Sequence, residues 1–203
     1  MKKDTKKYIN LENDISFFIE LEKLKSIYRQ AVVKSDQNRF ENSAEHSWHA
    51  MICAYALKDY FVSLNYDFDR ALKMLLIHDV VEIDAGDTFV YDSSKILSQQ
   101  DEKEAQAANR IFSLPNKMLA NELSSLWYEF DENKTDTALF ANAIDKFTPF
   151  ILNVFGGGGT WRNNSIKSEQ VLKRNENLKT IAPPLWIYLN DKVKEAIEKG
   201  WLV

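Results

Sequence analysis

The chain has 203 residues, 45% of them hydrophobic, which is typical of one large domain or at most two small ones with a sizeable core. Its net charge of −4, without a dense run of Lys and Arg beyond the first residues, argues against a nucleic-acid polymer as a partner. The single cysteine, Cys53, excludes an intrachain disulfide and a cysteine-rich zinc site. No apolar stretch has the length of a signal peptide or a membrane span, so we expect a cytoplasmic protein without a membrane partner.

The first half of the chain predicts three helices. Apolar residues recur at helical spacing over residues 11–33, and the polar residues 34–42 predict a loop. Ser43 can cap a second helix, with the sequence AEHSWHAMICAYALKDYFV. Asp69 can cap a third helix, RALKMLLIHDVVEID, which we expect to end at Gly86.

The second half is interrupted by one run of four glycines, at residues 156–159. Helical patterns there cover residues 97–112, 115–130, 136–153, 168–177 and 184–199. The glycine run has no strand-to-helix context, so it indicates a flexible loop and not a phosphate-binding one. The sequence therefore predicts an all-α fold in a single compact domain.

Two apolar stripes on these helices are expected to pack in the core. They are formed by Phe18, Leu21, Leu24 and Ile27 on the first helix and by Trp48, Met51, Ile52 and Tyr55 on the second. A stripe of this kind is more commonly core packing than part of a cofactor site.

All three histidines lie in two adjacent predicted helices. His46 and His49 are three residues apart in the second helix, and His78 precedes Asp79 at the end of the apolar run ALKMLLI. Glu82 follows one helical turn after His78. An imidazole nitrogen and a carboxylate oxygen together suit a borderline divalent ion. A lone histidine in a helix is more commonly a satisfied polar residue, so it is the combination that favours a metal site.

Other metal and nucleotide motifs are absent from the sequence. It has neither H-E-x-x-H nor the E-x-x-H of ferritin-like di-iron proteins, which argues against both classes. It also lacks a P-loop and the G-x-S-x-G of a nucleophile elbow.

Three motifs, in this order, resemble those of the HD-domain metal-dependent phosphohydrolases. They are E-N-x-A-E-H-S-W at residues 41–48, L-L-I-H-D-V-V-E-I-D-A-G-D-T at residues 75–88 and A-I-D-K at residues 143–146. Within this family the chain is similar to the 5′-deoxynucleotidase-like branch. The resemblance covers residues 11–203 and implies a single HD domain over residues 1–203. In this domain, a metal-site core of about residues 11–155 precedes C-terminal helices over residues 160–203.

The family binds one divalent ion through a histidine, a His-Asp pair and a distant aspartate. By this resemblance the ligands are His46, His78, Asp79 and Asp145. The resemblance leaves open which ion is bound, among Mn, Co, Zn, Fe, Ni and Mg. It also implies that Glu82 and Asp87 are catalytic groups that line the reaction site without binding the ion.

Two arginines match substrate-binding or neighbouring positions of the family. Arg29, at the end of the first predicted helix, is expected to contact the substrate phosphate. Arg39 is expected to be structural or close to the site. Gln30 stands where some members have an aromatic residue beside the nucleoside.

The resemblance implies an enzyme that hydrolyses (deoxy)nucleoside 5′-monophosphates to nucleoside and phosphate with a metal-activated water. One alternative is a nucleotide-binding or regulatory module that keeps the fold without turnover. Another is a nucleoside triphosphatase or cyclic-nucleotide diesterase of the same superfamily. The complete ligand set and the presence of Glu82 favour the enzyme. Because the family usually pairs, we also expect a homodimer to which the helices beyond Pro115 contribute.

Overall fold

The structure, a computed structural model, describes the backbone of residues 2–203 and the side chains of residues 7–93 and 95–203. Met1, which the single-domain prediction includes, lies outside the described residues. Helices make up most of the chain and are accompanied by one short antiparallel hairpin. The predicted all-α class is therefore confirmed.

The α-helices, in chain order, are α1 (Lys2–Leu21), α2 (Ser43–Leu57), α3 (Phe68–Ile77), α4 (Glu82–Ala85), α5 (Ser94–Ile111), α6 (Lys117–Glu132), α7 (Asp136–Phe155), α8 (Gly159–Asn163), α9 (Ser168–Arg174), α10 (Leu178–Ile181) and α11 (Pro183–Glu198). The 3₁₀ helices are η1 (Glu22–Ser26), η2 (Lys58–Tyr60) and η3 (His78–Val81), and the strands are β1 (Tyr28–Val33) and β2 (Arg39–Asn42). Within the described residues, none of these helices combines the length and the apolar character needed to cross a membrane.

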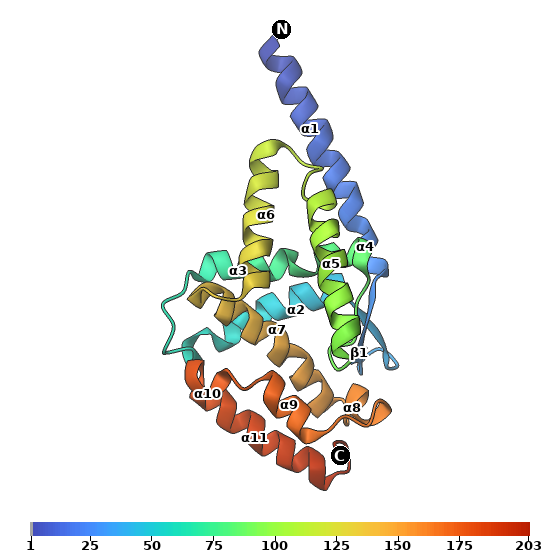
Figure 1. The fold of residues 1–203 in the computed structure, drawn as a ribbon, viewed down its shortest axis with the longest axis vertical. Coiled ribbons are helices and arrows are strands. Elements are labelled where there is room, and N and C mark those ends of the chain that lie inside the picture. The colour runs from blue at the N-terminus through green and yellow to red at the C-terminus, as the bar shows by residue number, and fades with distance from the viewer. Residues whose placement is uncertain (1) are drawn as a thin grey trace.

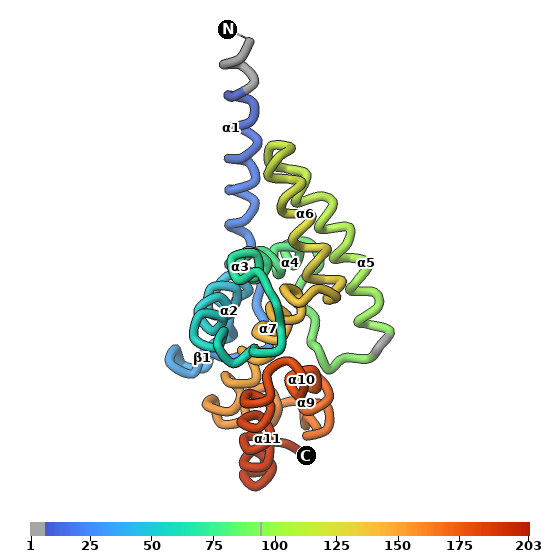
Figure 2. The backbone as a smooth tube through the Cα atoms, turned by 90° about the vertical axis from the view of Figure 1, so that its left-hand side faces the viewer, coloured from blue at the N-terminus to red at the C-terminus, as the bar shows by residue number. Residues whose placement is uncertain are grey.

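Helix α7 runs through the middle of the molecule (Figure 1). It contacts α2, α3, α6 and strand β1, and its buried face includes Phe140, Ile144 and Phe147. Helices α5 and α6 lie side by side, α8 to α11 form the end of the molecule near the C-terminus, and α1 projects from the body (Figures 1 and 2). Because α7 is central, polar side chains on it are held in the interior of the fold.

The predicted helix over residues 11–33 is wrong in its second half. Helix α1 ends at Leu21, and after the turn η1 the chain enters strand β1, which pairs antiparallel with β2. Strand β1 ends in two valines, whose β-branched side chains favour an extended chain. Gln37 and Asn38 adopt left-handed backbone conformations, with φ of 52° and 61°, in the turn between the strands. The predicted loop therefore shrinks to this turn.

The predicted third helix is interrupted at the histidine. Asp67, and not Asp69, caps α3 by accepting the backbone N–H of Arg70. The helix ends just before His78, which begins the 3₁₀ helix η3, and α4 then leads to Gly86. A 3₁₀ helix has about three residues per turn, so it redirects the side chains that follow.

The two apolar stripes expected in the core are only partly buried: Leu24 lies in the core, and Leu21, Ile27 and Met51 pack against it, whereas the other four side chains are exposed. On α1, Phe18 is 71% exposed and its neighbour Phe17 is buried instead. On α2, the side chains of Trp48, Ile52 and Tyr55 are half exposed or more. The buried face of α2 carries His46, Ser47, Ala50 and Ala54. Small side chains on this face let α2 pack closely on α3 and α7, which turns the larger apolar residues outward.

Candidate metal centre

Four side chains from three separate segments meet in the interior of the fold. His46 comes from α2, His78 and Asp79 from η3, and Asp145 from α7. One potential ligand atom from each of His46, His78 and Asp145 lies within 4.8 Å of the others. Nε2 of His46 is 2.8 Å from Oδ1 of Asp145, and Nε2 of His78 is 3.1 Å from Oδ1 of Asp79. Imidazole nitrogens and carboxylate oxygens this close together have the composition of a site for a divalent transition metal.

Groups behind the two imidazole rings orient them toward this cluster. Nδ1 of His78 lies 2.9 Å from the carbonyl oxygen of Leu75, to which its N–H can donate. This leaves the lone pair on Nε2 of His78, a buried atom without a hydrogen-bond partner among the described residues. Nδ1 of His46 faces a carboxylate oxygen of Glu41 at 3.5 Å. Metal-binding histidines characteristically present their outer N–H to a carbonyl or a carboxylate in this way.

The carboxylates in and around the cluster carry more negative charge than the guanidinium of Arg29 can balance. Nη1 of Arg29 is surrounded by three carboxylates, which belong to Asp79, Glu82 and Asp87 at 2.6, 3.4 and 3.7 Å. With Asp145, four carboxylates thus face one guanidinium. An excess of buried negative charge is costly unless a counter-ion offsets it, so these residues fit a divalent cation.

A positive charge at the centre is favoured even when only protons are available. Burial lowers the pKa of His78, but the nearby carboxylates of Asp79 and Asp145 raise it to about 9. Because histidine binds a metal through its neutral ring, an ion would take the place of this proton.

Glu82 and Asp87 lie beside the cluster, and the pKa of each carboxyl group is raised. Burial, followed by the charges of neighbouring acids, raises the pKa of Glu82 well above its usual range. Burial also raises the pKa of Asp87 to about 6, against the opposing effect of the nearby guanidinium. The carboxyl group of Asp87 can therefore exchange a proton near neutral pH, as general acids and bases do, and that of Glu82 holds a proton more readily than an ordinary glutamate.

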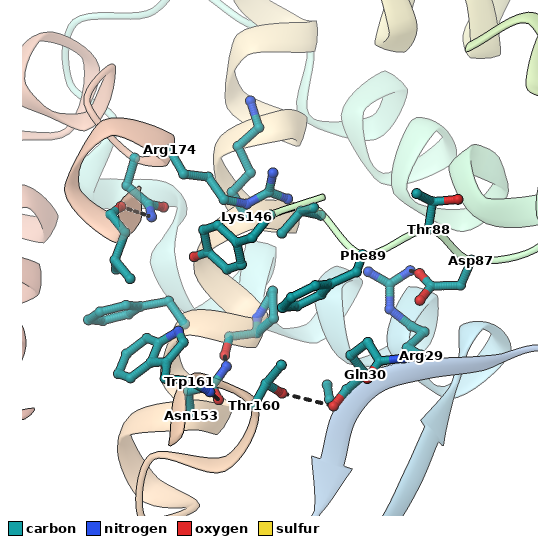
Figure 3. A pocket seen from close by; sticks show the side chains of 17 residues that line it. Arg29, Gln30, Asp87, Thr88, Phe89, Lys146, Asn153, Thr160, Trp161 and Arg174 are labelled. Atoms are coloured by element: carbon teal, nitrogen blue, oxygen red, sulfur yellow. Dashed lines mark hydrogen bonds and ion pairs between the residues drawn. The ribbon is translucent and has the colours of Figure 1, made fainter. Parts of the chain in front are cut away.

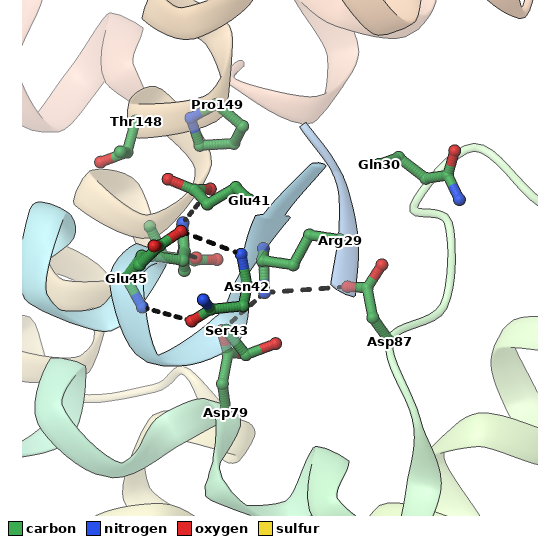
Figure 4. Close-up of polar contacts among 12 residues, drawn as sticks. Arg29, Gln30, Glu41, Asn42, Ser43, Glu45, Asp79, Asp87, Thr148 and Pro149 are labelled. Carbon is green, nitrogen blue, oxygen red and sulfur yellow. Dashed lines mark hydrogen bonds and ion pairs between the residues drawn. The ribbon is translucent and has the colours of Figure 1, made fainter. Parts of the chain in front are cut away.

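The start of α2 contributes a contact that the sequence did not predict. Asn42 caps the helix by accepting the N–H of Glu45, whose carboxylate accepts the N–H of Asn42 in return (Figure 4). Ser43, the predicted cap, is therefore free to donate its hydroxyl hydrogen to Glu82. The sequence offers two adjacent capping residues, and only the structure decides between them.

The structure separates the two predicted arginines. Arg29 lies on strand β1, and not at the end of a helix as predicted. Of its nitrogens, only Nη1 forms hydrogen bonds with described residues, and the side chain lines two pockets. Arg39 lies on β2 in solvent and pairs with Asp36 and Glu45. It joins the hairpin turn to α2.

Two pockets adjoin the cluster and share Arg29, Asp87 and Arg174 in their walls. The first, shown in Figure 3, is also lined by Lys146 and by the aromatic residues Phe89, Tyr91, Phe150 and Trp161. The second is lined by the acids Asp79, Glu82, Asp101, Glu104, Asp131 and Asp145. Lys146 ends the A-I-D-K motif, so the sequence could have indicated that it lies near the cluster. No local pattern marks Arg174 at the end of α9.

Comparisons with known proteins agree with this geometry. A model of the HD domain family matches residues 21–186. The crystal structure of a predicted metal-dependent phosphohydrolase from Magnetospirillum magnetotacticum is similar to this chain, with 38% identity, a TM-score of 0.85 and coverage of 96% of each chain. The chain therefore belongs to the HD domain family.

The chain is also similar to proteins named 5′-deoxynucleotidase HDDC2. The human protein is 28% identical over 123 residues, which are 61% of this chain and 58% of the human one. The Dictyostelium discoideum protein is 28% identical over 144 residues, or 68% and 74% of the two chains. The match thus spans little more than half of the human protein's length. These findings confirm the resemblance to HD-domain phosphohydrolases of the 5′-deoxynucleotidase-like branch.

Proposed function

We propose that the protein is a metal-dependent phosphohydrolase that releases phosphate from (deoxy)nucleoside 5′-monophosphates. The observation that carries this proposal is the buried cluster of His46, His78, Asp79 and Asp145 beside the guanidinium of Arg29. The names of its relatives, a metal-dependent phosphohydrolase and several 5′-deoxynucleotidases, support the same reaction and nucleotides as its substrates.

The chain's own residues can then be given roles in the hydrolysis. The two histidines and two aspartates would hold the ion, which would act as a Lewis acid and lower the pKa of a bound water toward neutrality. Glu82, with its raised pKa, accepts the proton of the attacking water. Arg29 donates to the phosphate oxygens and offsets the charge that builds on them. Asp87 either protonates the leaving 5′-oxygen or binds a sugar hydroxyl.

A catalytically weak module that binds nucleotides for regulation is the alternative function. Such a module needs the fold and Arg29, but it has no use for a buried general base. The buried carboxyl group of Glu82, in contact with Arg29 and Ser43 beside the cluster, therefore favours the enzyme.

We also propose that the protein forms a homodimer in the cytoplasm and acts on small molecules. The exposed apolar side chains of α1 and α2, which include Phe18 and Trp48, support association between copies.

The test of the enzymatic function is phosphate release from a panel of nucleotides. Protein stripped with a chelator is supplied separately with Mn²⁺, Co²⁺, Zn²⁺, Fe²⁺, Ni²⁺ or Mg²⁺ and offered ribo- and deoxyribonucleoside 5′-monophosphates. We expect no release without a metal and release with at least one of them. Nucleotide binding without release under any metal would support the regulatory module instead.

A further inference from the structure

Two basic side chains line the first pocket and form no ion pair with a described acidic residue. Lys146 follows Asp145 on α7, Arg174 ends α9, and both belong to the same pocket as Arg29 (Figure 3). Neither side chain forms a hydrogen bond or an ion pair with any described residue. Asp145 does act on Lys146 through its charge, but its Oδ1 already faces both histidines of the cluster.

This lack of a partner is unusual for partly buried cations in this chain. Arg29 lies among the acids of the site, and Arg70 pairs with Glu129 at 2.5 Å. Such pairing is expected because a buried charge loses hydration that a partner must replace. Lys146 and Arg174 also carry like charges and lie near each other (Figure 3), so an anion between them would offset both.

The walls of this pocket come from distant segments of the chain, and a hydrogen bond connects two of them. Thr160 of α8 donates to the carbonyl oxygen of Gln30 on β1 at 2.8 Å, which ties two of its walls together (Figure 3). Phe89, Tyr91 and Trp161 supply flat apolar surfaces. Surfaces of this kind suit the organic part of a ligand, a base or a sugar, while the cations suit a charged group attached to it.

The second pocket shares Arg29 and Arg174 with the first, but acids outnumber these two cations in its walls. Its walls add Asp101, Glu104 and Asp131 to the acids of the metal centre. A negatively charged leaving group would be repelled there. A substrate with one phosphate at the metal cluster is therefore expected to extend toward Lys146 and Arg174.

We propose that Lys146 and Arg174 form a subsite for a second phosphate group, so that the preferred substrate is a nucleoside 3′,5′-bisphosphate. This inference rests on the proposed function and specifies its substrate. The oxygen of water forms a bond to the 5′-phosphorus, the bond from that phosphorus to the 5′-oxygen breaks, and the 5′-oxygen takes up a proton. The products are inorganic phosphate and a nucleoside 3′-monophosphate, and water is the only co-reactant.

The experiment compares two substrates that differ only in the second phosphate. For the metal-loaded protein, kcat/KM is measured with 2′-deoxyadenosine 3′,5′-bisphosphate and with 2′-deoxyadenosine 5′-monophosphate. We expect the bisphosphate to be favoured by about 10- to 150-fold, the effect of one charge-assisted hydrogen bond. Lys146→Gln and Arg174→Gln should each lower this preference by about tenfold or more. Lys173→Gln removes the same charge from an exposed neighbouring position and should leave the preference unchanged.

Metal content and product identity complete the test. Each variant should keep its metal, which excludes an indirect effect of Lys146→Gln through Asp145, and the product should be 2′-deoxyadenosine 3′-monophosphate. Three results would each overturn the subsite. They are a ratio of the two kcat/KM values near one, a ratio that the two variants do not change, and release of the 3′-phosphate. If neither substrate is hydrolysed, the proposed function fails, and calorimetric titration with the bisphosphate then tests the subsite by itself. Equal affinity in the wild type and in the double variant would overturn it.

Discussion

Arg29 and Arg39 are both arginines of the hairpin, but their surroundings predict different roles. Arg29 lies among carboxylates of the metal centre, whereas Arg39 pairs with Asp36 and Glu45 in solvent. A charge-assisted bond to phosphate contributes about 1.5–3 kcal/mol, so Arg29→Ala should lower kcat/KM by about 10- to 150-fold. Arg29→Lys should recover only part of this, because an ammonium group lacks the planar fork. Steady-state kinetics with metal analysis measures both effects.

Arg39→Ala is the matched control for this prediction. It should leave kcat/KM about unchanged. A loss of kcat/KM in Arg39→Ala but not in Arg29→Ala would assign the phosphate to Arg39. No loss in either variant would mean that the substrate is not a phosphomonoester held in this way.

Glu82 combines burial, a raised pKa and a position beside the cluster of histidines and aspartates. If it accepts the proton of the attacking water, Glu82→Gln should lower kcat by about 10²- to 10⁴-fold, the usual contribution of a positioned base. The amide oxygen can still accept the hydrogen bond from Ser43, so the fold and the metal content should be retained. Turnover at the wild-type rate would remove Glu82 from the mechanism.

The raised pKa of Glu104 predicts that the free energy of unfolding depends on pH. Burial raises its pKa to about 7, while its bond from Gln100 acts in the opposite direction. A carboxyl group whose pKa is raised by folding stabilises the protein fully below its unfolded pKa, and this contribution is lost as pH rises from about 4.5 to about 7. The free energy of unfolding of Glu104→Gln, relative to that of the wild type, should therefore be about 1–3 kcal/mol higher at pH 8 than at pH 4.5.

Thermal or denaturant unfolding in the presence of a chelator measures this difference. Glu102→Gln, on the exposed face of the same helix, is the control and should show no such gain. A constant difference between Glu104→Gln and the wild type at all pH values would contradict the assignment.

At the scale of elements, the long helices could be predicted from the sequence because each presents several turns of apolar residues. Those corresponding to α5, α6, α7 and α11 differ from the prediction by at most three residues at either end. The hairpin could not be predicted in this way. Its strands are too short for a clear alternation, and helical spacing continues by chance from α1 through Ile27.

The site was only partly predictable for a related reason. His78 and Asp79 are adjacent in the sequence, but Asp145 lies on another helix, and only its resemblance to a family motif singles it out. Arg174 has no such motif, and its place in the pocket depends on how α9 packs against the rest of the fold. Helical spacing also identifies the apolar face of α2 without showing which face is buried, so Trp48 was placed on the wrong side.

At the scale of the whole molecule, two apolar surfaces are left exposed by the residues that the structure describes. Helix α1 projects from the body (Figures 1 and 2) with Ile15, Phe18 and Ile19 exposed, and α2 exposes Trp48 and Ile52. Apolar surfaces of this kind mark association sites, so we expect a homodimer at micromolar concentration in light scattering. A monomer at that concentration would rule it out.

Charged substitutions can locate the dimer interface. Trp48→Glu together with Ile52→Glu should weaken the dimer if α2 forms the contact. Met118→Glu, on the exposed surface of α6, tests the expected contribution of the helices beyond Pro115 in the same way.

The central claim is that His46, His78, Asp79 and Asp145 hold one divalent ion that the reaction requires. Its most direct test measures the metal-to-protein ratio and phosphate release on the same preparations of wild type, His78→Ala and His49→Ala. His49 is the control, because it lies outside the cluster and lines a surface pocket with Trp48. We predict about one ion per chain and phosphate release in the wild type and in His49→Ala, and the loss of both in His78→Ala. A His78→Ala protein that keeps its ion and its phosphate release would contradict the account.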